Sequence, residues 1–323
     1  MLRYLVRRVL TSIPLLVFAS LITFWLVRVT VDPLAQYRHS RDAARLLAQQ
    51  KRALGLNHPL VVQWWNWLTA ILHGNLGTSA RTQDSVSTMV KHALWPSTQL
   101  LFWATITSLL VAVLLGVYSA VRQYSVGDYV ATGLSYLGIA MPDFWFALLA
   151  IALLVTGPRV WFHLNRPIFF SLGLHSAGVS GLNLDYFRHL FLPVLTLTFT
   201  SVATWSRFLR ASMLDVLNAD YIRTARAKGV PQRRIVLRHA FRNALVPFTT
   251  VTALDTAYLL GGVIITEKIF AIAGMGQAFL TALDHGDAPF LLTWFLLVSI
   301  AVIGIGLLTD VAYVALDPRI RLQ

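Results

Sequence analysis

Six long apolar stretches constrain the fold of this chain more than any other feature of its sequence. Each has roughly 20 residues or more, the length that a helix needs to cross a hydrocarbon layer of about 30 Å. Only 13% of the residues are charged, which is about half the share found in a soluble domain. The sequence therefore predicts an all-α integral membrane protein with six transmembrane helices, at Val9–Val29, Gln99–Ala120, Tyr129–Thr156, Leu190–Leu209, Ala244–Thr266 and Phe290–Val314.

The first apolar stretch follows a basic N-terminus, so a cleaved signal peptide is an alternative interpretation of it. The stretch is longer than the apolar part of a usual signal peptide, and it contains Pro14 and Trp25. No convincing small-x-small cleavage site followed by a soluble domain is present. We expect an uncleaved membrane helix.

The basic residues predict the orientation of the spans, because Lys and Arg in short loops stay on the cytoplasmic side. With both termini in the cytoplasm, that side holds Arg122, nine basic residues between Arg207 and Arg242, and the basic residues of the two ends. The basic residues at the ends are Arg3, Arg7, Arg8, Arg319 and Arg321. The two short outside loops hold only Arg159, Arg166, Arg188 and Lys268. Both termini and the basic segment are therefore expected on the cytoplasmic side.

The first outside loop is about 70 residues long, and loops of that length cross the membrane largely regardless of their charge. It contains two amphipathic segments, Ala35–Gly55 and Val61–Ser79, that we expect to be helical. The tryptophans of the second segment, Trp64, Trp65 and Trp67, suit a position at the membrane interface. The loop is interpreted as a packed cap outside the membrane, and a docking site for an external partner stays open beside that.

Several kinds of catalytic site have no counterpart in this sequence. It contains no G-x-x-x-x-G-K-[ST] phosphate loop, no H-E-x-x-H and no G-x-S-x-G with a placed His and acid. It has no cysteine, and its histidines are too scattered to form a local metal site. We therefore expect a non-enzyme that binds no metal or cofactor itself and takes its energy from an ion gradient or a partner.

Residues 220–247, DYIRTARAKGVPQRRIVLRHAFRNALVP, form a strongly basic segment in this apolar chain. The sequence predicts a short helix over Leu214–Lys228, a turn at Gly229, and a second helix that has Pro231 in its first turn. In the second helix one face is basic, with Arg234, Arg238 and Arg242, and the other is apolar, with Leu237, Phe241, Ala244 and Leu245. The apolar side is expected to pack inward while the basic side faces headgroups or a partner. Lipid anchoring explains the charge but not the turn. Nucleic-acid binding is disfavoured because both ends of the segment are tied to membrane spans.

This segment resembles the cytoplasmic loop of permease subunits in binding-protein-dependent ABC importers, dipeptide and oligopeptide branch. The likeness rests on ARAKG followed by RHAFRNALVP, and it extends over nearly the whole chain through MLRYLVRRVL, LGLNHPLVVQW, HGNLGTS, MPDFW, EKIFAIAGMG and DPRIRL. It implies the type I ABC importer permease fold, in a multi-pass protein of the bacterial cytoplasmic (inner) membrane. It also implies a division into 1–98, the first transmembrane helix with the outer loop, and 99–323, a five-helix core with a cytoplasmic coupling-helix loop at 210–243.

The resemblance also implies a docking role for the basic segment, in which its short helix sits in a groove of an ATPase subunit. The residues that this assigns to docking are Asp220, Tyr221, Arg223, Thr224, Ala225, Arg226, Ala227, Lys228, Gly229, Pro231 and Arg234. The implied partners are a second homologous permease, two ABC ATPase subunits or domains that bind ATP and Mg, an extracytoplasmic substrate-binding protein and the lipid bilayer. The sequence departs from the family at Ala273, where Pro is usual, and at Asp143, where a small neutral residue is usual. Of the general Glu-Ala-Ala-x-x-x-Gly motif it keeps only Ala225 and Gly229.

Two carboxylates fall near the middle of predicted spans, where an ionised group costs several kcal/mol unless it faces water or a partner. Asp143 follows Pro142 and could cap a restarting helix, whereas Asp255 has no such local role. Our hypothesis is that both line an aqueous pathway and attract the ammonium group of the substrate, together with Trp145 and Tyr258. A neutral, hydrogen-bonded Asp is the competing interpretation.

Two further acidic residues lie at the ends of spans. Asp310 is expected to pair with a nearby Arg. Glu267, the only Glu in the chain, is either a gate residue or an interfacial charge.

The function expected from the resemblance is that of a permease subunit in an ATP-driven peptide importer, the first permease of the pair. A proton-coupled secondary transporter is an alternative, although such folds commonly show internal repeats and more spans. A membrane scaffold or an intramembrane enzyme is a third possibility. Within the family, glutathione or nickel chelates could replace peptides, and the sequence does not identify the substrate.

Overall fold

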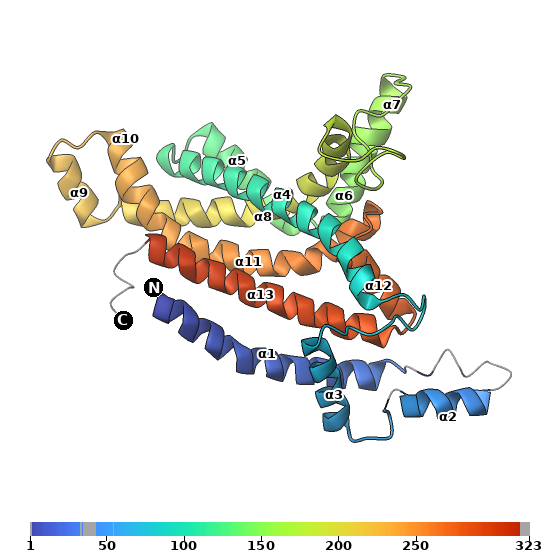
Figure 1. The fold of residues 1–323 in the computed structure, drawn as a ribbon. Coiled ribbons are helices and arrows are strands. Elements are labelled where there is room, and N and C mark those ends of the chain that lie inside the picture. Colours follow the sequence, from blue (N-terminus) through green and yellow to red (C-terminus); the bar gives the residue numbers. More distant parts are fainter. Residues whose placement is uncertain (1, 33, 35–42, 54, 317–323) are drawn as a thin grey trace.

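A computed structural model of the chain describes residues 2–32, 34, 43–53 and 55–316, and within these residues it forms a bundle of long helices without a β-strand (Figure 1). The helices are α1 Leu2–Thr30, α2 Ala43–Ala53, α3 Leu60–Leu72, α4 Val86–Val121, α5 Val126–Ala140, α6 Asp143–Ile151, α7 Gly157–Trp161, α8 Leu184–Leu217, α9 Asp220–Ala227, α10 Gln232–Arg234, α11 Phe241–Ile269, α12 Met275–Asp284 and α13 Ala288–Leu316. Two π-helical segments, η2 Ala152–Thr156 and η3 Ile235–Ala240, continue α6 and α10.

Five helices of the described part are long and apolar enough to cross a membrane, and each overlaps one of the six predicted spans. They are Val6–Thr30, Val86–Val121, Asp143–Trp161, Gln232–Gly261 and Ala288–Tyr313. The predicted all-α membrane fold is thereby confirmed.

The sixth predicted span, Leu190–Leu209, lies within the 34-residue helix α8, which is long enough to cross but more polar than the other five. Helix α8 packs against α4, α5, α6 and α11, so protein rather than lipid covers much of its surface. Two of its buried hydroxyl groups bond to its own backbone: Thr196 donates to the Leu192 carbonyl at 2.9 Å, and Ser201 to the Leu197 carbonyl at 2.9 Å. A helix surrounded by protein can carry such polar groups, and this explains its lower hydropathy.

The third predicted span, Tyr129–Thr156, is not one continuous helix. Helix α5 ends at Ala140, the backbone is extended at Met141 and Pro142 with ψ of 122° and 140°, and α6 begins at Asp143. Proline lacks a backbone N–H and disfavours the helical conformation of the residue before it, which explains the break. In Figure 1, α5 lies toward the end of the bundle where α9 is found, and α6 and α7 lie toward the opposite end.

The two ends of the bundle differ in what they carry. The start of α1, the end of α13, α9 and α10 lie together at one end, which we call the α9 end (Figure 1). Helix α12 lies at the opposite end, which we call the α12 end. This arrangement agrees with the expectation that both termini share a side with the basic segment. The predicted basic residues Arg319 and Arg321 lie outside the described residues.

The loop between the first two spans folds back onto α1. Its first predicted amphipathic segment is helical at α2, and residues 35–42 lie outside the described part. In α3, the Trp64 indole donates to the Ser20 hydroxyl of α1 at 3.1 Å, and the Trp67 and Phe24 rings lie 5.6 Å apart. Trp65 is 56% exposed. Two of the three tryptophans therefore pack on α1 and not at a lipid surface, which favours the interpretation of a packed cap.

Candidate functional site

Helix α9 is a separate short helix and does not continue the long helix before it. Helix α8 ends at Leu217, and Ala219, with ψ of 149°, turns the chain before α9 begins at Asp220. The predicted continuous helix over Leu214–Lys228 is therefore wrong at Asn218 and Ala219, which separate the end of α8 from α9. Helices of eight residues are not stable alone in water, so α9 depends on contacts with the bundle.

A single buried side chain anchors α9. Ile222 is 0% exposed and is the only buried residue of this helix. It belongs to an apolar cluster, which we call the α9-end cluster, formed by Ala112, Ala120, Trp205, Leu209, Met213, Leu217, Ile222, Ile235, Val236, Ala240, Ala244 and Phe248. The Asn243 amide of α11 adds a second tie by donating to the Tyr221 hydroxyl at 2.9 Å. Neither contact was predicted from the sequence, although Ile222 is the only aliphatic residue larger than Ala in DYIRTARA.

The turn after α9 confirms the role predicted for Gly229. This residue has φ of +76°, a left-handed conformation that favours glycine. Its N–H donates to the Arg226 carbonyl at 2.9 Å, and the Val230 N–H donates to the Ala225 carbonyl at 3.1 Å. This pair of bonds is the Schellman motif that closes helix C-termini. Pro231 then directs the chain into α10, and its carbonyl accepts the N–H of Arg234 at 2.9 Å.

The predicted docking residues share one exposed surface, which we call the α9 surface. The exposed members are Asp220, Tyr221, Arg223, Thr224, Arg226, Ala227, Lys228, Gly229, Pro231 and Arg234, and Ala225 is half-buried. Asp220 and Arg223 form an exposed pair at 3.4 Å, so Arg226, Lys228 and Arg234 leave the surface with a positive charge. A small, rigidly anchored basic surface suits an acidic protein partner.

The packing face of the second predicted helix differs from expectation. Because η3 is π-helical, with more residues per turn than an α-helix, the side chains turn inward in a different register. Ile235, Val236 and Ala240 are buried, whereas Leu237 is 50% exposed. The prediction that Leu237 packs inward is therefore wrong, while Ala244 is buried as predicted.

A partly buried ion pair joins α5 to α8. Arg210 donates through Nε and Nη2 to both oxygens of Asp128, each at 2.8 Å. The backbone N–H of Tyr124 donates to the same carboxylate at 2.9 Å. Both residues lie just outside the predicted spans, and the hydrogen bonds from Arg210, helped by Tyr124 and opposed by burial, hold the pKa of the Asp128 carboxyl below its ordinary value. The two residues are 82 positions apart, and no local pattern predicted their pairing.

The carboxylates of Asp143 and Asp255 both bond to α8. Asp143 accepts a hydrogen bond from the Thr200 hydroxyl, and Asp255 accepts one from the Trp205 indole at 2.8 Å. No side-chain cap bond forms at the start of α6, so the described bond of Asp143 is directed at α8 rather than at its own helix. The other two predicted pathway residues are exposed, Trp145 at 48% and Tyr258 at 79%.

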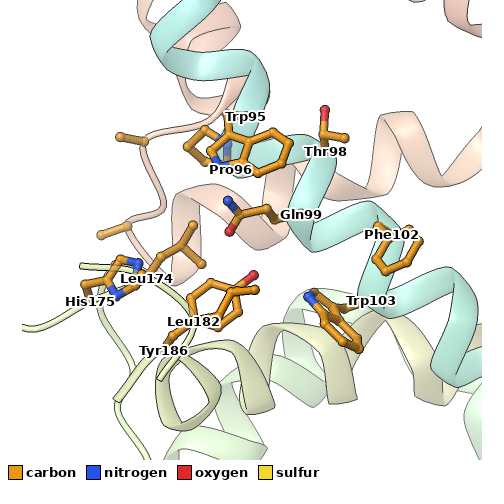
Figure 2. A pocket seen from close by; sticks show the side chains of 14 residues that line it. Trp95, Pro96, Thr98, Gln99, Phe102, Trp103, Leu174, His175, Leu182 and Tyr186 are labelled. Atoms are coloured by element: carbon orange, nitrogen blue, oxygen red, sulfur yellow. The ribbon is translucent and has the colours of Figure 1, made fainter. Parts of the chain in front are cut away.

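A large cavity lies at the α12 end, between α4, the loop before α8 and the loop after α11 (Figure 2). Its volume is about 790 Å³. Its wall combines aromatic and other apolar residues with the hydrogen-bonding groups of Thr98, Gln99 and His175. The aromatic residues are Trp95, Phe102, Trp103 and Tyr186. Such a lining suits a mainly apolar group. None of the predicted pathway residues lines this cavity.

The structure shows the contacts of Glu267 and Asp310, the other two acidic residues considered in the sequence. Glu267 is 0% exposed and accepts bonds from Ser97 and from the first N–H groups of α12, those of Gly276 and Gln277, at 2.8 and 3.0 Å. It therefore fixes the start of α12 to the end of α11 and is not an interfacial charge. Asp310 pairs with Arg8 of α1 at 2.9 Å, and this agrees with the expected Arg partner. Within the described residues, no group of three or more metal-ligating side chains is placed to hold an ion.

The known proteins to which this chain is similar include membrane components of transport systems. Residues 112–322 match the family model described as binding-protein-dependent transport system inner membrane component, and residues 1–94 match its N-terminal companion. The chain is 34% identical to the oligopeptide transport system permease protein AppB of Bacillus subtilis, over 98% of this chain and 99% of that protein. It is 35% identical to OppB of Mycobacterium tuberculosis, an oligopeptide transport system permease protein, over the full length of both. It is also 35% identical to the glutathione transport system permease protein GsiC of Salmonella typhi, over 99% of both.

A solved structure supports the fold independently. The crystal structure of an amino acid ABC transporter with histidines matches with a TM-score of 0.50 at 12% identity, covering 70% of this chain and 94% of that one. At this identity the similarity concerns the fold alone.

Proposed function

Because this chain belongs to the family of binding-protein-dependent transport system inner membrane components, as a non-catalytic ABC importer permease, we propose that it forms half of the membrane pathway of a peptide importer. A second homologous permease forms the other half. Two ATPase subunits, which bind ATP and Mg, drive the pathway from the α9 end, and an external substrate-binding protein delivers substrate at the α12 end. The α9 end then faces the cytoplasm of a bacterial cell.

The observation that carries this proposal is the α9 surface. Helix α9 projects from the end of the bundle, exposes nearly every residue predicted for docking, and is held by Ile222 in the α9-end cluster. A partner that pushes on such a helix moves the bundle with it, because the helix cannot shift without uncovering its anchor. The positive charge of the surface directs it to an acidic groove on the ATPase.

The substrate class follows from the relatives and from the chemistry of the site. Two relatives are named for oligopeptides and one for glutathione, which is itself a small peptide. Asp143 and Asp255 supply negative charge for the ammonium group of a peptide in the pathway, together with Trp145 and Tyr258. The apolar cavity of Figure 2 supplies space for a side chain at the external mouth.

A glycine pair tests the docking proposal. Gly229→Pro cannot keep φ of +76° and loses the N–H that donates to Arg226. Gly178→Pro is the matched control, because Gly178 has φ of +78°, has open space around it as Gly229 does, and lies in the loop before α8. We expect Gly229→Pro to lower the amount of ATPase subunit that copurifies by about tenfold or more, and Gly178→Pro to leave it unchanged. Equal retention by both variants would show that α9 is not the docking element.

A further inference from the structure

The partly buried ion pair Asp128–Arg210 connects helix α8, whose end precedes α9, to helix α5, the first half of the broken crossing α5–α6. Arg210 lies in α8 between Leu209 and Met213, two members of the α9-end cluster that also holds Ile222. Asp128 lies in the first turn of α5, and its side chain is only 3% exposed. The pair therefore connects the segment of α8 nearest α9 to the start of α5.

Beyond the ion pair, α5 follows α8 closely toward the break. Ser135 and Ser206 have their hydroxyl oxygens 3.4 Å apart. A Cβ atom on Gly138 would lie 2.7 Å from the Cβ atom of Ala203, which is closer than such atoms approach. Only glycine permits this close contact, so α5 and α8 are packed backbone against backbone at this point.

The contact with α8 continues on the far side of the break. Asp143 accepts the Thr200 hydroxyl, and the rings of Phe146 and Phe199 stack with centroids 4.2 Å apart. Helix α8 thus touches both halves of the broken crossing, and only the extended residues Met141 and Pro142 lie between them. A change in the angle between the two halves has its hinge at those two residues.

The contact between α5 and α8 nearest α9 is an ion pair, and this type of interaction fixes geometry more than it adds stability. The Asp128 side chain is 3% exposed and that of Arg210 is 26% exposed. Removal of charged groups from water costs free energy that their attraction need not exceed, so such a pair often adds little to stability. What a bidentate Arg–carboxylate pair supplies is one fixed geometry. The small residues further along α5 provide close packing but no comparable directional bond.

We propose that Asp128 and Arg210 are positioning residues that lock α5 to α8, so that a displacement of α9 is delivered to the hinge at Met141–Pro142. Peptide passage then depends on the lock, whereas binding of the ATPase and ATP hydrolysis do not. The inference rests on the proposed docking of an ATPase at α9. It differs from that proposal because it concerns the transfer of movement inside this chain.

The test uses the complete importer complex in proteoliposomes and measures ATPase retention, ATP hydrolysis and peptide uptake separately. A double-mutant cycle combines Asp128→Asn, Arg210→Gln and the double variant. The control is Asp215→Asn, which removes the charge of an exposed Asp on α8, the helix of Arg210. We expect either single variant to lower uptake per ATP hydrolysed by about tenfold with ATPase retention intact, and the double variant to lose no more than the worse single one. Unchanged uptake per ATP, or losses that add in the double variant, would overturn the inference.

A second measurement does not depend on transport. The chain has no cysteine, so Val130→Cys on α5 and Asp215→Cys on α8 can carry spin labels in an otherwise unchanged protein. We expect a narrow distance distribution between the labels that broadens when Asp128→Asn is added. A distribution that stays narrow would show that the ion pair does not lock the two helices.

Discussion

Removal of the Ile222 anchor tests whether docking depends on the position of α9 as well as on the residues that this helix exposes. Ile222→Ala leaves every exposed residue of the α9 surface in place but removes the only buried side chain of this helix. Substitution of a buried Ile by Ala costs about 2–5 kcal/mol, from lost burial and from the cavity that remains. Because an eight-residue helix has little stability of its own, most of that cost falls on the docking of α9 to the bundle.

The lower bound of about 2 kcal/mol corresponds to a roughly thirtyfold shift in the equilibrium between docked and detached α9. We expect faster hydrogen exchange in residues 220–227 and a weaker affinity of the purified complex for its ATPase subunit. Leu237→Ala is the control, since it removes an apolar side chain of similar size that is 50% exposed in η3; its effect should be within about 0.5 kcal/mol. If Ile222→Ala leaves both exchange and affinity at the wild-type level, α9 is not held by this anchor.

Two further predictions concern the substrate. Asp143→Asn and Asp255→Asn keep hydrogen-bonding atoms for α8 but remove the charge, so we expect the KM for peptides with a free amino terminus to rise about tenfold while blocked peptides are unaffected; equal uptake of both peptide types in mutants and wild type would refute the role. Trp95→Ala removes from the cavity wall an indole that is 66% exposed. We expect uptake of Leu-Leu to fall about three- to tenfold relative to uptake of Gly-Gly. Trp161→Ala, at a similarly exposed indole outside the cavity, should change neither, and an equal loss for both dipeptides in Trp95→Ala would contradict the prediction.

Local signals in the sequence were enough to predict much of this fold. The length of the apolar stretches predicted the positions of the membrane spans, because every span must carry enough apolar residues to cross the hydrocarbon layer. Gly229 predicted the turn after α9 correctly, because few other residues adopt a left-handed backbone conformation. Pro142 indicated the break in the third crossing, because proline interrupts a helix and Asp143 directly after it could cap a restarting one.

The remaining features depend on contacts that no single segment encodes. Asp128 and Arg210 are 82 residues apart, and Trp205 and Asp255 are 50 apart, so their pairing follows only from how α8 packs. Leu237 was placed inward because an α-helical period was assumed, and the π-helical η3 shifted the register. The polar character of α8 likewise reflects its burial by neighbouring helices, which hydropathy alone does not reveal.

The proposed function requires that this chain moves its substrate by coupling to ATP hydrolysis at the α9 end. The most direct measurement is peptide uptake by the complete complex in sealed proteoliposomes, with ATP confined to the compartment that α9 faces. We expect transport toward that compartment to require ATP there and to continue unchanged when an uncoupler collapses the proton gradient. Uptake that follows an imposed proton gradient without ATP, and stops with the uncoupler, would contradict the claim.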